Sequence, residues 1–228
     1  MKRLSWIFFL VCITLASPAQ RNSDYGVFVG VSSYFGDINP SRPLYSPMPA
    51  AGVFYRYNFH PRCAIRANLF AGMVKGNDLD FSNSFQQMRA ASFSGTVEEF
   101  SAQYEFNFLP FTTEGKLWDF TPYFSAGAGI AIVNTVSTEY QPVLPFSFGF
   151  KVNAFKNLGV ELEYGFRKTF YDNFDGLKDP IAPSDYAWLH NNDWYTFTGI
   201  AVTWKIYNRL AGCPAYTDVD KKDRRKKK

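Results

Sequence analysis

The sequence predicts an all-β protein, a transmembrane antiparallel β-barrel of about eight strands with up-and-down topology. Three observations predict this fold: an export signal at the N-terminus, strict two-residue alternation of apolar and polar side chains, and connections that alternate between short and long. Aromatic residues make up 19% of the chain, yet its mean hydropathy is −0.20. A sheet with one apolar and one polar face explains how a chain rich in aromatic residues can have a slightly polar average.

Residues 1–19 are predicted to form a cleavable signal peptide. Lys2 and Arg3 give a basic start, residues 4–15 are almost entirely apolar, and Ser17-Pro18-Ala19 offers small residues to a signal peptidase. We place cleavage after Ala19. The apolar run is too short to cross the roughly 30 Å hydrocarbon core of a bilayer as a helix. Cys12 lies inside this run, so we expect no lipid anchor.

Alternating side chains predict the strands. Along residues 160–167, Val, Leu, Tyr and Phe alternate with Glu161, Glu163, Gly165 and Arg167. Because successive side chains of a strand point to opposite faces, each set lies on one face. Equally clean segments and less regular ones complete the eight predicted strands, which are 25–35, 52–59, 65–72, 99–108, 121–137, 146–154, 160–167 and 193–205.

The connections alternate in length, as they do in outer-membrane barrels with short periplasmic turns and long external loops. Tight turns are expected at 59–63 and 155–159. Longer polar loops are expected at 36–47, 76–92 and 171–192, and a shorter one at 138–145. The connection at 109–120 is an exception, because it should be periplasmic but is long. The sequence thus predicts a barrel over residues 20–205, a periplasmic tail over 206–228 and both termini in the periplasm.

The polar faces predict a filled interior. A sheet survives in hydrocarbon only when it closes and pairs its backbone groups, so the apolar faces would contact outer-membrane lipid. The interior of an eight-stranded barrel is only wide enough for its own side chains. We therefore expect an ion-pair network and no open channel. Its predicted members are Arg56, Arg66, Glu99, Glu105, Lys151, Glu161, Glu163, Arg167 and Lys205.

One alternative competes with this interpretation. A soluble periplasmic β-sandwich would pack the same Phe and Tyr faces against each other and leave Arg and Glu in water. In a barrel, Trp118, Trp188, Trp194 and Trp204 would join an aromatic girdle near the strand ends. The number of strands and the rhythm of the connections favour the barrel.

Catalytic patterns are sparse. The two histidines are His60, in a tight turn, and His190, in a loop with Asp185 and Asp193 nearby. A His/Asp hydrolase site is conceivable there, but a solvated loop histidine is the simpler interpretation. The sequence has no metal-ligand spacing, phosphate loop or nucleophile elbow. We expect no enzyme activity, cofactor, small-molecule substrate or nucleic-acid partner.

The C-terminal tail carries two features of its own. Residues 221–228 hold seven basic residues and Asp223, which is a solvated end or a basic docking segment. After signal cleavage the cysteines are Cys63 and Cys213, both predicted to be periplasmic. An internal disulfide, a free thiol and a disulfide to a partner protein all remain open. The Cys213-Pro214 pair is accordingly a candidate for partner docking or disulfide formation.

Short motifs resemble PorG, the small outer-membrane barrel of the type IX secretion system of Bacteroidota. They are Tyr34-Phe35-Gly36-Asp37 followed by Ile38-Asn39-Pro40, the turn Asn58-Phe59-His60-Pro61-Arg62, and Cys213-Pro214. The resemblance extends through the chain after residue 19. It implies a role in protein secretion and, in some members, gliding motility, with the ring lipoprotein PorK and its companion PorN as partners. It implies no catalytic residues.

The function therefore has three candidate classes. The first is a structural component of the secretion machinery that anchors a periplasmic ring to the outer membrane. The second is a generic OmpA-like or adhesin-like barrel, and the third is a surface enzyme. The sequence itself indicates an outer-membrane barrel, whereas secretion follows only from the resemblance.

Overall fold

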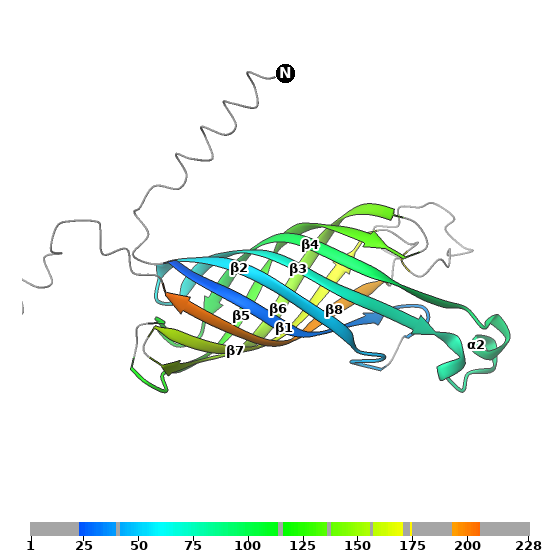
Figure 1. Ribbon diagram of the computed structural model, residues 1–228, viewed down its shortest axis with the longest axis horizontal. Coiled ribbons are helices and arrows are strands. Elements are labelled where there is room, and N and C mark those ends of the chain that lie inside the picture. Colours follow the sequence, from blue (N-terminus) through cyan, green and yellow to red (C-terminus); the bar gives the residue numbers. More distant parts are fainter. Residues whose placement is uncertain are drawn as a thin grey trace, which may run out of the picture. The chain divides into compact units, whose positions relative to one another are not determined.

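Eight antiparallel strands close into one barrel in the computed structural model of the protein (Figure 1). The structure describes residues 23–39, 42–113, 116–135, 138–155, 157–170, 174 and 193–205. The predicted signal peptide and tail therefore lie outside the described residues. The same is true of Asp185, Trp188, His190, Cys213 and Pro214.

The strands are long and evenly distributed along the chain. They are β1 (Ser23–Phe35), β2 (Met48–His60), β3 (Cys63–Asn77), β4 (Ser92–Asn107), β5 (Phe120–Asn134), β6 (Thr138–Phe155), β7 (Leu158–Thr169) and β8 (Trp194–Lys205). Each strand pairs with its neighbours in the chain, and β1 closes the barrel by pairing with β8 from Asp24↔Lys205 to Phe35↔Trp194. The predicted antiparallel barrel is confirmed, and the sandwich alternative is wrong.

One predicted loop is a strand. Residues 138–145 belong to β6, and the connection between β5 and β6 is correspondingly short. Pro142 and Pro145 suggested a loop because proline cannot donate to a strand ladder. The structure accommodates Pro145 by interrupting the pairing with β5 between Phe146 and Val143, after which the pairing resumes in the same register.

The barrel has two distinct ends. We call the end with the short β2–β3 and β6–β7 connections the turn end, where β1 also begins and β8 finishes. The opposite end is the loop end. There the connection between β3 and β4 contains a short 3-10 helix, η1 (Asp78–Asp80), and a helical turn, α2 (Ser84–Arg89) (Figure 1). The side chains of Asn77 and Asn83 accept hydrogen bonds from the backbone amides of Leu79 and Phe85, the second residues of these two segments.

The long connection between β4 and β5 closes the turn end. Phe111 N donates to Pro61 O at 2.9 Å, and Trp118 N donates to Asn153 O at 3.0 Å. The connection is thus tied to the β2–β3 turn and to β6. Its residues Phe111 and Thr113 are buried. This packing accounts for the one predicted turn that was longer than the periplasmic pattern allows.

Side chains alternate between the interior and the outer wall along every strand. The outer wall exposes large apolar residues, and Val29, Leu69 and Ile130 are each more than half exposed. Trp118 is 70% exposed at the turn end and Trp204 is 37% exposed nearby in β8. In the described part of the chain, no helix is both long and apolar enough to span a membrane.

Candidate functional site in the barrel interior

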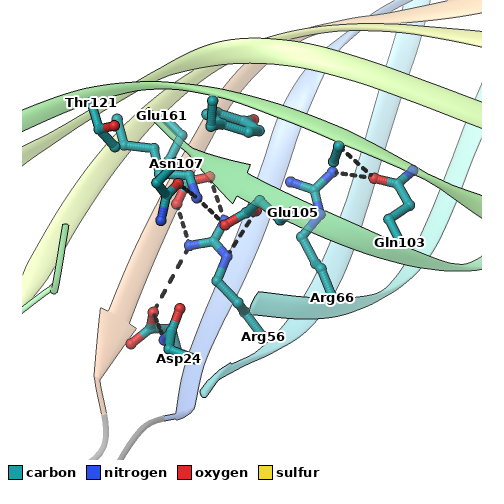
Figure 2. Close-up of polar contacts among 12 residues, drawn as sticks. Asp24, Arg56, Arg66, Gln103, Glu105, Asn107, Thr121 and Glu161 are labelled. Atoms are coloured by element: carbon teal, nitrogen blue, oxygen red, sulfur yellow. Dashed lines mark hydrogen bonds and ion pairs between the residues drawn. The ribbon is translucent and has the colours of Figure 1, made fainter. Parts of the chain in front are cut away.

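Arg56 is the centre of the charged cluster at the turn end. It projects inward from β2 and forms a bidentate pair with Glu161 of β7, with both N···O distances at 2.6 Å. Its Nε donates to Glu105 of β4 at 3.1 Å (Figure 2). Lys151 also donates to Glu105 and donates to Asn107 Oδ1 at 3.1 Å. One guanidinium therefore joins strands from opposite sides of the interior.

Arg66 forms the next layer toward the loop end. It is fully buried and pairs with both carboxylate oxygens of Glu163, at 2.7 and 2.8 Å. The Tyr123 hydroxyl donates to the same carboxylate at 2.9 Å, and Arg66 also donates to Gln103 Oε1 at 3.1 Å. Bidentate pairing and extra donors offset the cost of burying these charges.

Arg167 is paired deeper in the interior. Its Nε donates to Glu99 Oε2 at 3.2 Å, and the Tyr195 hydroxyl donates to the same oxygen at 2.8 Å. The guanidinium carbon lies 4.8 Å from the centroid of the Phe197 ring. Arg167 thus marks the boundary between the charged cluster and an aromatic one.

Eight of the nine predicted network residues are buried and take part in these ion pairs. Lys205 differs, because it is only half-buried at the end of β8. Its register partner is Asp24 of β1, a buried carboxylate that accepts from Asn58 at 2.7 Å and lies 3.9 Å from Arg56. Sequence reasoning missed Asp24 because the first strand was predicted to begin one residue later.

The loop-end half of the interior is aromatic, which the sequence analysis did not predict. Phe28, Phe70 and Phe197 form a contiguous set, with ring centroids 5.0 to 6.5 Å apart. Tyr34 stacks on Phe174, with their ring centroids 5.5 Å apart. Ion pairs therefore occupy only part of the barrel interior.

Inward-facing glycines make room for these rings. Gly26 pairs with Phe54 and Gly52 pairs with Phe70 across neighbouring strands. A Cβ on Gly26 would lie 2.1 Å from the Phe54 ring, and one on Gly52 would lie 1.9 Å from the Phe70 ring. A glycine opposite an inward phenylalanine is the sequence signal that would have predicted the aromatic half.

The Tyr34-Phe35-Gly36-Asp37 motif forms a buried junction at the loop end. The Tyr34 hydroxyl donates to Asp193 Oδ1 at 2.5 Å and accepts from the backbone amide of Asp37 at 3.1 Å. A Cβ on Gly36 would lie 2.2 Å from that hydroxyl. The motif ties the end of β1 to the segment preceding β8, which is a structural role in this chain.

The remaining candidates show no catalytic arrangement among the described residues. His60 Nδ1 accepts from the amide of Arg62 at 3.2 Å and so braces the β2–β3 turn. Asp193 is buried against Tyr34. Within the described ranges, no group of three His, Cys, Asp or Glu residues is arranged to hold a metal.

Cys63 lies at the turn end on the outer wall. The Tyr104 hydroxyl donates to its sulfur at 3.0 Å, and Cys63 forms no disulfide with another described residue. The predicted pairing with Cys213 falls outside the described residues. An internal disulfide, a free thiol and a disulfide to a partner therefore all stay open predictions.

These features define a small closed eight-stranded β-barrel with an apolar outer wall and an ion-paired, aromatic-filled interior. The chain belongs to the family described as Domain of unknown function (DUF6089), whose model matches residues 1–215. No curated protein matches the sequence.

Several solved structures are similar in fold. Neisserial surface protein A shares 10% identity at a TM-score of 0.48, covering 81% of this chain and 97% of that chain. The N-terminal β-barrel domain of Pseudomonas aeruginosa OprF shares 14% identity at a TM-score of 0.42, with coverages of 80% and 98%. Ail, the attachment invasion locus protein of Yersinia pestis, shares 13% identity at a TM-score of 0.43, with coverages of 80% and 97%.

Proposed function

We propose that the protein is a non-enzymatic outer-membrane barrel that serves as a sealed structural anchor. The observation that carries this proposal is the distribution of side chains between the two faces of one closed sheet. Phe100, Phe148 and Leu162 are more than half exposed on the outer wall, whereas Arg66 and Arg167 are fully buried inside. A protein surrounded by water would have the opposite preference.

Membrane insertion follows physically from this distribution. In hydrocarbon every backbone N–H and C=O needs an internal partner, and the closed pairing of β1 with β8 leaves no open sheet edge. The outer apolar residues then contact lipid acyl chains without a solvation cost. We propose that the turn end faces the periplasm, because short turns lie there in outer-membrane barrels. Both termini would then be periplasmic.

A structural role suits the interior better than a channel or a catalytic centre. Buried guanidinium groups are each held by carboxylates, and the rings of Phe28 and Phe197 fill the other half. The ion pairs and the rings thus occupy the interior with side chains of the protein itself. At the turn end, Phe111 of the β4–β5 connection is buried and its amide donates to Pro61 O.

The test combines membrane fractionation, electrophoresis and conductance. The full-length protein expressed in a Gram-negative host should stay in the outer-membrane fraction after alkaline carbonate washing. It should also migrate faster on SDS gels when it is not boiled. In planar bilayers the refolded barrel should give no sustained single-channel current. Release by carbonate would refute membrane insertion, and large stable currents would refute the sealed interior.

The finer role we propose is in type IX secretion, and it rests on the resemblance to PorG. In that role the barrel anchors a periplasmic ring of PorK and PorN to the outer membrane and supports gliding motility where the organism glides. The turn end provides the point of departure for residues 206–228, since β8 ends there at Lys205. Docking would use Cys213-Pro214 and the basic end of the tail.

Three variants test this docking: truncation after Asp220, Cys213→Ser and the matched control Cys63→Ser. If the tail docks through both its basic end and Cys213, truncation and Cys213→Ser should each reduce recovery of the ring proteins in pull-downs, while Cys63→Ser leaves it unchanged. Non-reducing gels separate the two disulfide hypotheses, because an internal bond would be lost in both cysteine variants. Unchanged recovery and secretion in the two tail variants would favour a generic OmpA-like or adhesin-like barrel.

A further inference from the structure

A cavity of about 320 Å³ lies on the outer wall at the loop end. Its walls come from β1, β7 and β8, and residues of the β1–β2 connection form its roof. The lining residues are Ser33, Tyr34, Phe35, Pro43, Leu44, Tyr164, Phe166 and Thr196. Strands β1 and β8 lie side by side here, at the seam that closes the barrel (Figure 1).

The cavity and an adjoining groove contain polar groups that the protein does not satisfy. Ser33 is only 2% exposed, faces the outer wall, and its hydroxyl has no hydrogen-bond partner. Thr198 does not line this cavity but the adjoining groove, and its hydroxyl is also buried without a partner. Burying an unpaired hydroxyl is costly, so these two groups suit a ligand that brings hydrogen-bonding atoms into an otherwise apolar wall.

An apolar groove continues from this cavity toward the middle of the barrel. The groove has a volume of about 300 Å³ and includes Tyr164, which also lines the cavity, and Thr198. The backbone at Gly149 and Gly199 lies at its floor, and Phe148, Phe150 and Ile200 form its sides. This shape accepts a hydrocarbon chain that runs along the barrel wall.

The roof of the cavity is held in an unusual conformation. Leu44 and Ser46 have φ values of 56° and 45°, a region that is unfavourable for a branched residue such as leucine. Tyr45 between them fixes the segment, because its hydroxyl hydrogen bonds with the carbonyl of Asn77 and the carboxylate of Asp80. The surrounding contacts thus hold Leu44 over the cavity.

A basic group lies at the rim. Lys168 is the next outward residue after Phe166 on β7, and its register row continues through Trp194 to Phe35. Its ammonium lies 5.0 Å from the Trp194 ring centroid. An amine at the outer edge, hydroxyls below it and an apolar groove below those are the order of groups along a phospholipid.

We propose that this cavity and groove bind one phosphorylated acyl lipid of the outer leaflet. The phosphate lies beside Lys168, an ester carbonyl accepts from Ser33 or Thr198, and one acyl chain occupies the groove over Gly199. The proposal rests on the proposed membrane function, because it requires the loop end to face the outer leaflet.

Native mass spectrometry of the full chain, refolded in neutral detergent and titrated with dipalmitoyl phosphatidylglycerol, tests the site. The wild type should retain one lipid with saturable affinity. Lys168→Gln should weaken that affinity about tenfold, and Ser33→Ala about fivefold, by the usual energies of charged and neutral hydrogen bonds. The matched control Lys75→Gln alters an exposed lysine on β3 and should leave the affinity unchanged.

Two further probes identify what is recognised. Dipalmitoylglycerol, which lacks the phosphate, should bind more weakly and be insensitive to Lys168→Gln. Glycerol phosphate, which lacks the chains, should not displace the lipid. Displacement by glycerol phosphate would show a simple phosphate site and overturn the lipid proposal. Non-saturating adducts, or equal loss in Lys168→Gln and Lys75→Gln, would also overturn it.

The same samples are examined for heat-modifiable migration on gels. A chain that migrates as a folded barrel but fails the lipid titration contradicts the lipid site alone. A chain that never forms a heat-modifiable barrel contradicts the membrane function and the lipid site together.

Discussion

The turn-end and loop-end halves of the barrel interior solve the same packing problem with different chemistry. At the turn end, Arg56 and Arg66 reach across to Glu161 and Glu163 on the far wall. At the loop end, the rings of Phe28, Phe70 and Phe197 meet edge to face or tilted. The stability of the charged half depends on each charge keeping its hydrogen-bonded partner. The stability of the aromatic half depends on how much volume the rings fill. The two halves should therefore fail differently when one side chain is removed.

Glu163→Ala should cause the largest loss of stability. It leaves the buried Arg66 without its bidentate partner and removes the acceptor of Tyr123. Breaking one side of a buried ion pair costs about 3–5 kcal/mol. The free energy of unfolding in urea, measured in lipid vesicles, gives the value. Glu98→Ala, an outward-facing glutamate of β4, is the matched control and should change it by less than about 0.5 kcal/mol.

The double variant Arg66→Met with Glu163→Leu sharpens this result. Replacing a buried ion pair by apolar residues of similar volume is often neutral or stabilising. We expect the double variant to recover at least half of the loss caused by Glu163→Ala. A double variant as unstable as Glu163→Ala would mean that the closed barrel needs the Arg66–Glu163 ion pair itself and not only the absence of an unpaired charge.

Phe197→Ala should cause the second largest loss, about 3 kcal/mol, because it opens a cavity between Phe28 and Phe70. Phe197→Leu should cost much less, since it restores most of the volume. The same unfolding measurement applies. Equal losses in the alanine and leucine variants would contradict a volume-based role for the aromatic half.

Tyr34→Phe should cost about 1–2 kcal/mol, because the buried Asp193 carboxylate loses a donor while the ring is retained. The loss should be confined largely to the loop end. Hydrogen exchange of the Asp37 amide, which donates to the Tyr34 hydroxyl, reports it locally. Protection of this amide equal to that of the wild type would show that the junction is held by packing alone.

The smallest effect is a pH dependence of the η1–α2 segment. Burial raises the pKa of Asp78, but the hydrogen bonds from Arg89 and from the Ala91 amide outweigh it and hold the pKa below its usual value of 3.8. The carboxylate therefore stabilises the segment above that value, and the stabilisation is lost as pH falls through the lower folded pKa. Hydrogen exchange of Ala91 should show this loss in the wild type, whereas Asp78→Asn should be independent of pH over the same range.

Sequence reasoning predicted the strands better than it predicted what fills the barrel. Strict alternation identified the inward faces of Arg56, Arg66 and Glu163 because side-chain direction along a strand is a local property. The partners of these residues lie on strands about one hundred positions away, so only the closed topology brings them together. Phe70 alternates with the outward residues in the same way, and Gly52 opposite it leaves space for its ring, but neither residue carries a charge that marks it as interior.

The errors in element boundaries have a similar physical origin. Pro142 and Pro145 made the first half of β6 look like a loop, although a proline can occupy a long strand where the ladder is interrupted. The length of the β4–β5 connection looked anomalous because its function as a cover over the turn end depends on contacts with Pro61 and Asn153. Neither contact is visible in a local sequence window.

The seam between β1 and β8 has a kinetic consequence. Every other strand pair can form as soon as two consecutive segments exist, but the seam joins Asp24 to Lys205 and requires nearly the whole chain. Closure of so long a loop is entropically expensive and slow. Until it occurs, Arg56 and Arg66 on the first strands lack Glu161 and Glu163 on the seventh. Charge neutralisation and ring closure should therefore be one cooperative step, and a partly assembled sheet should lack both until its last strand pairs.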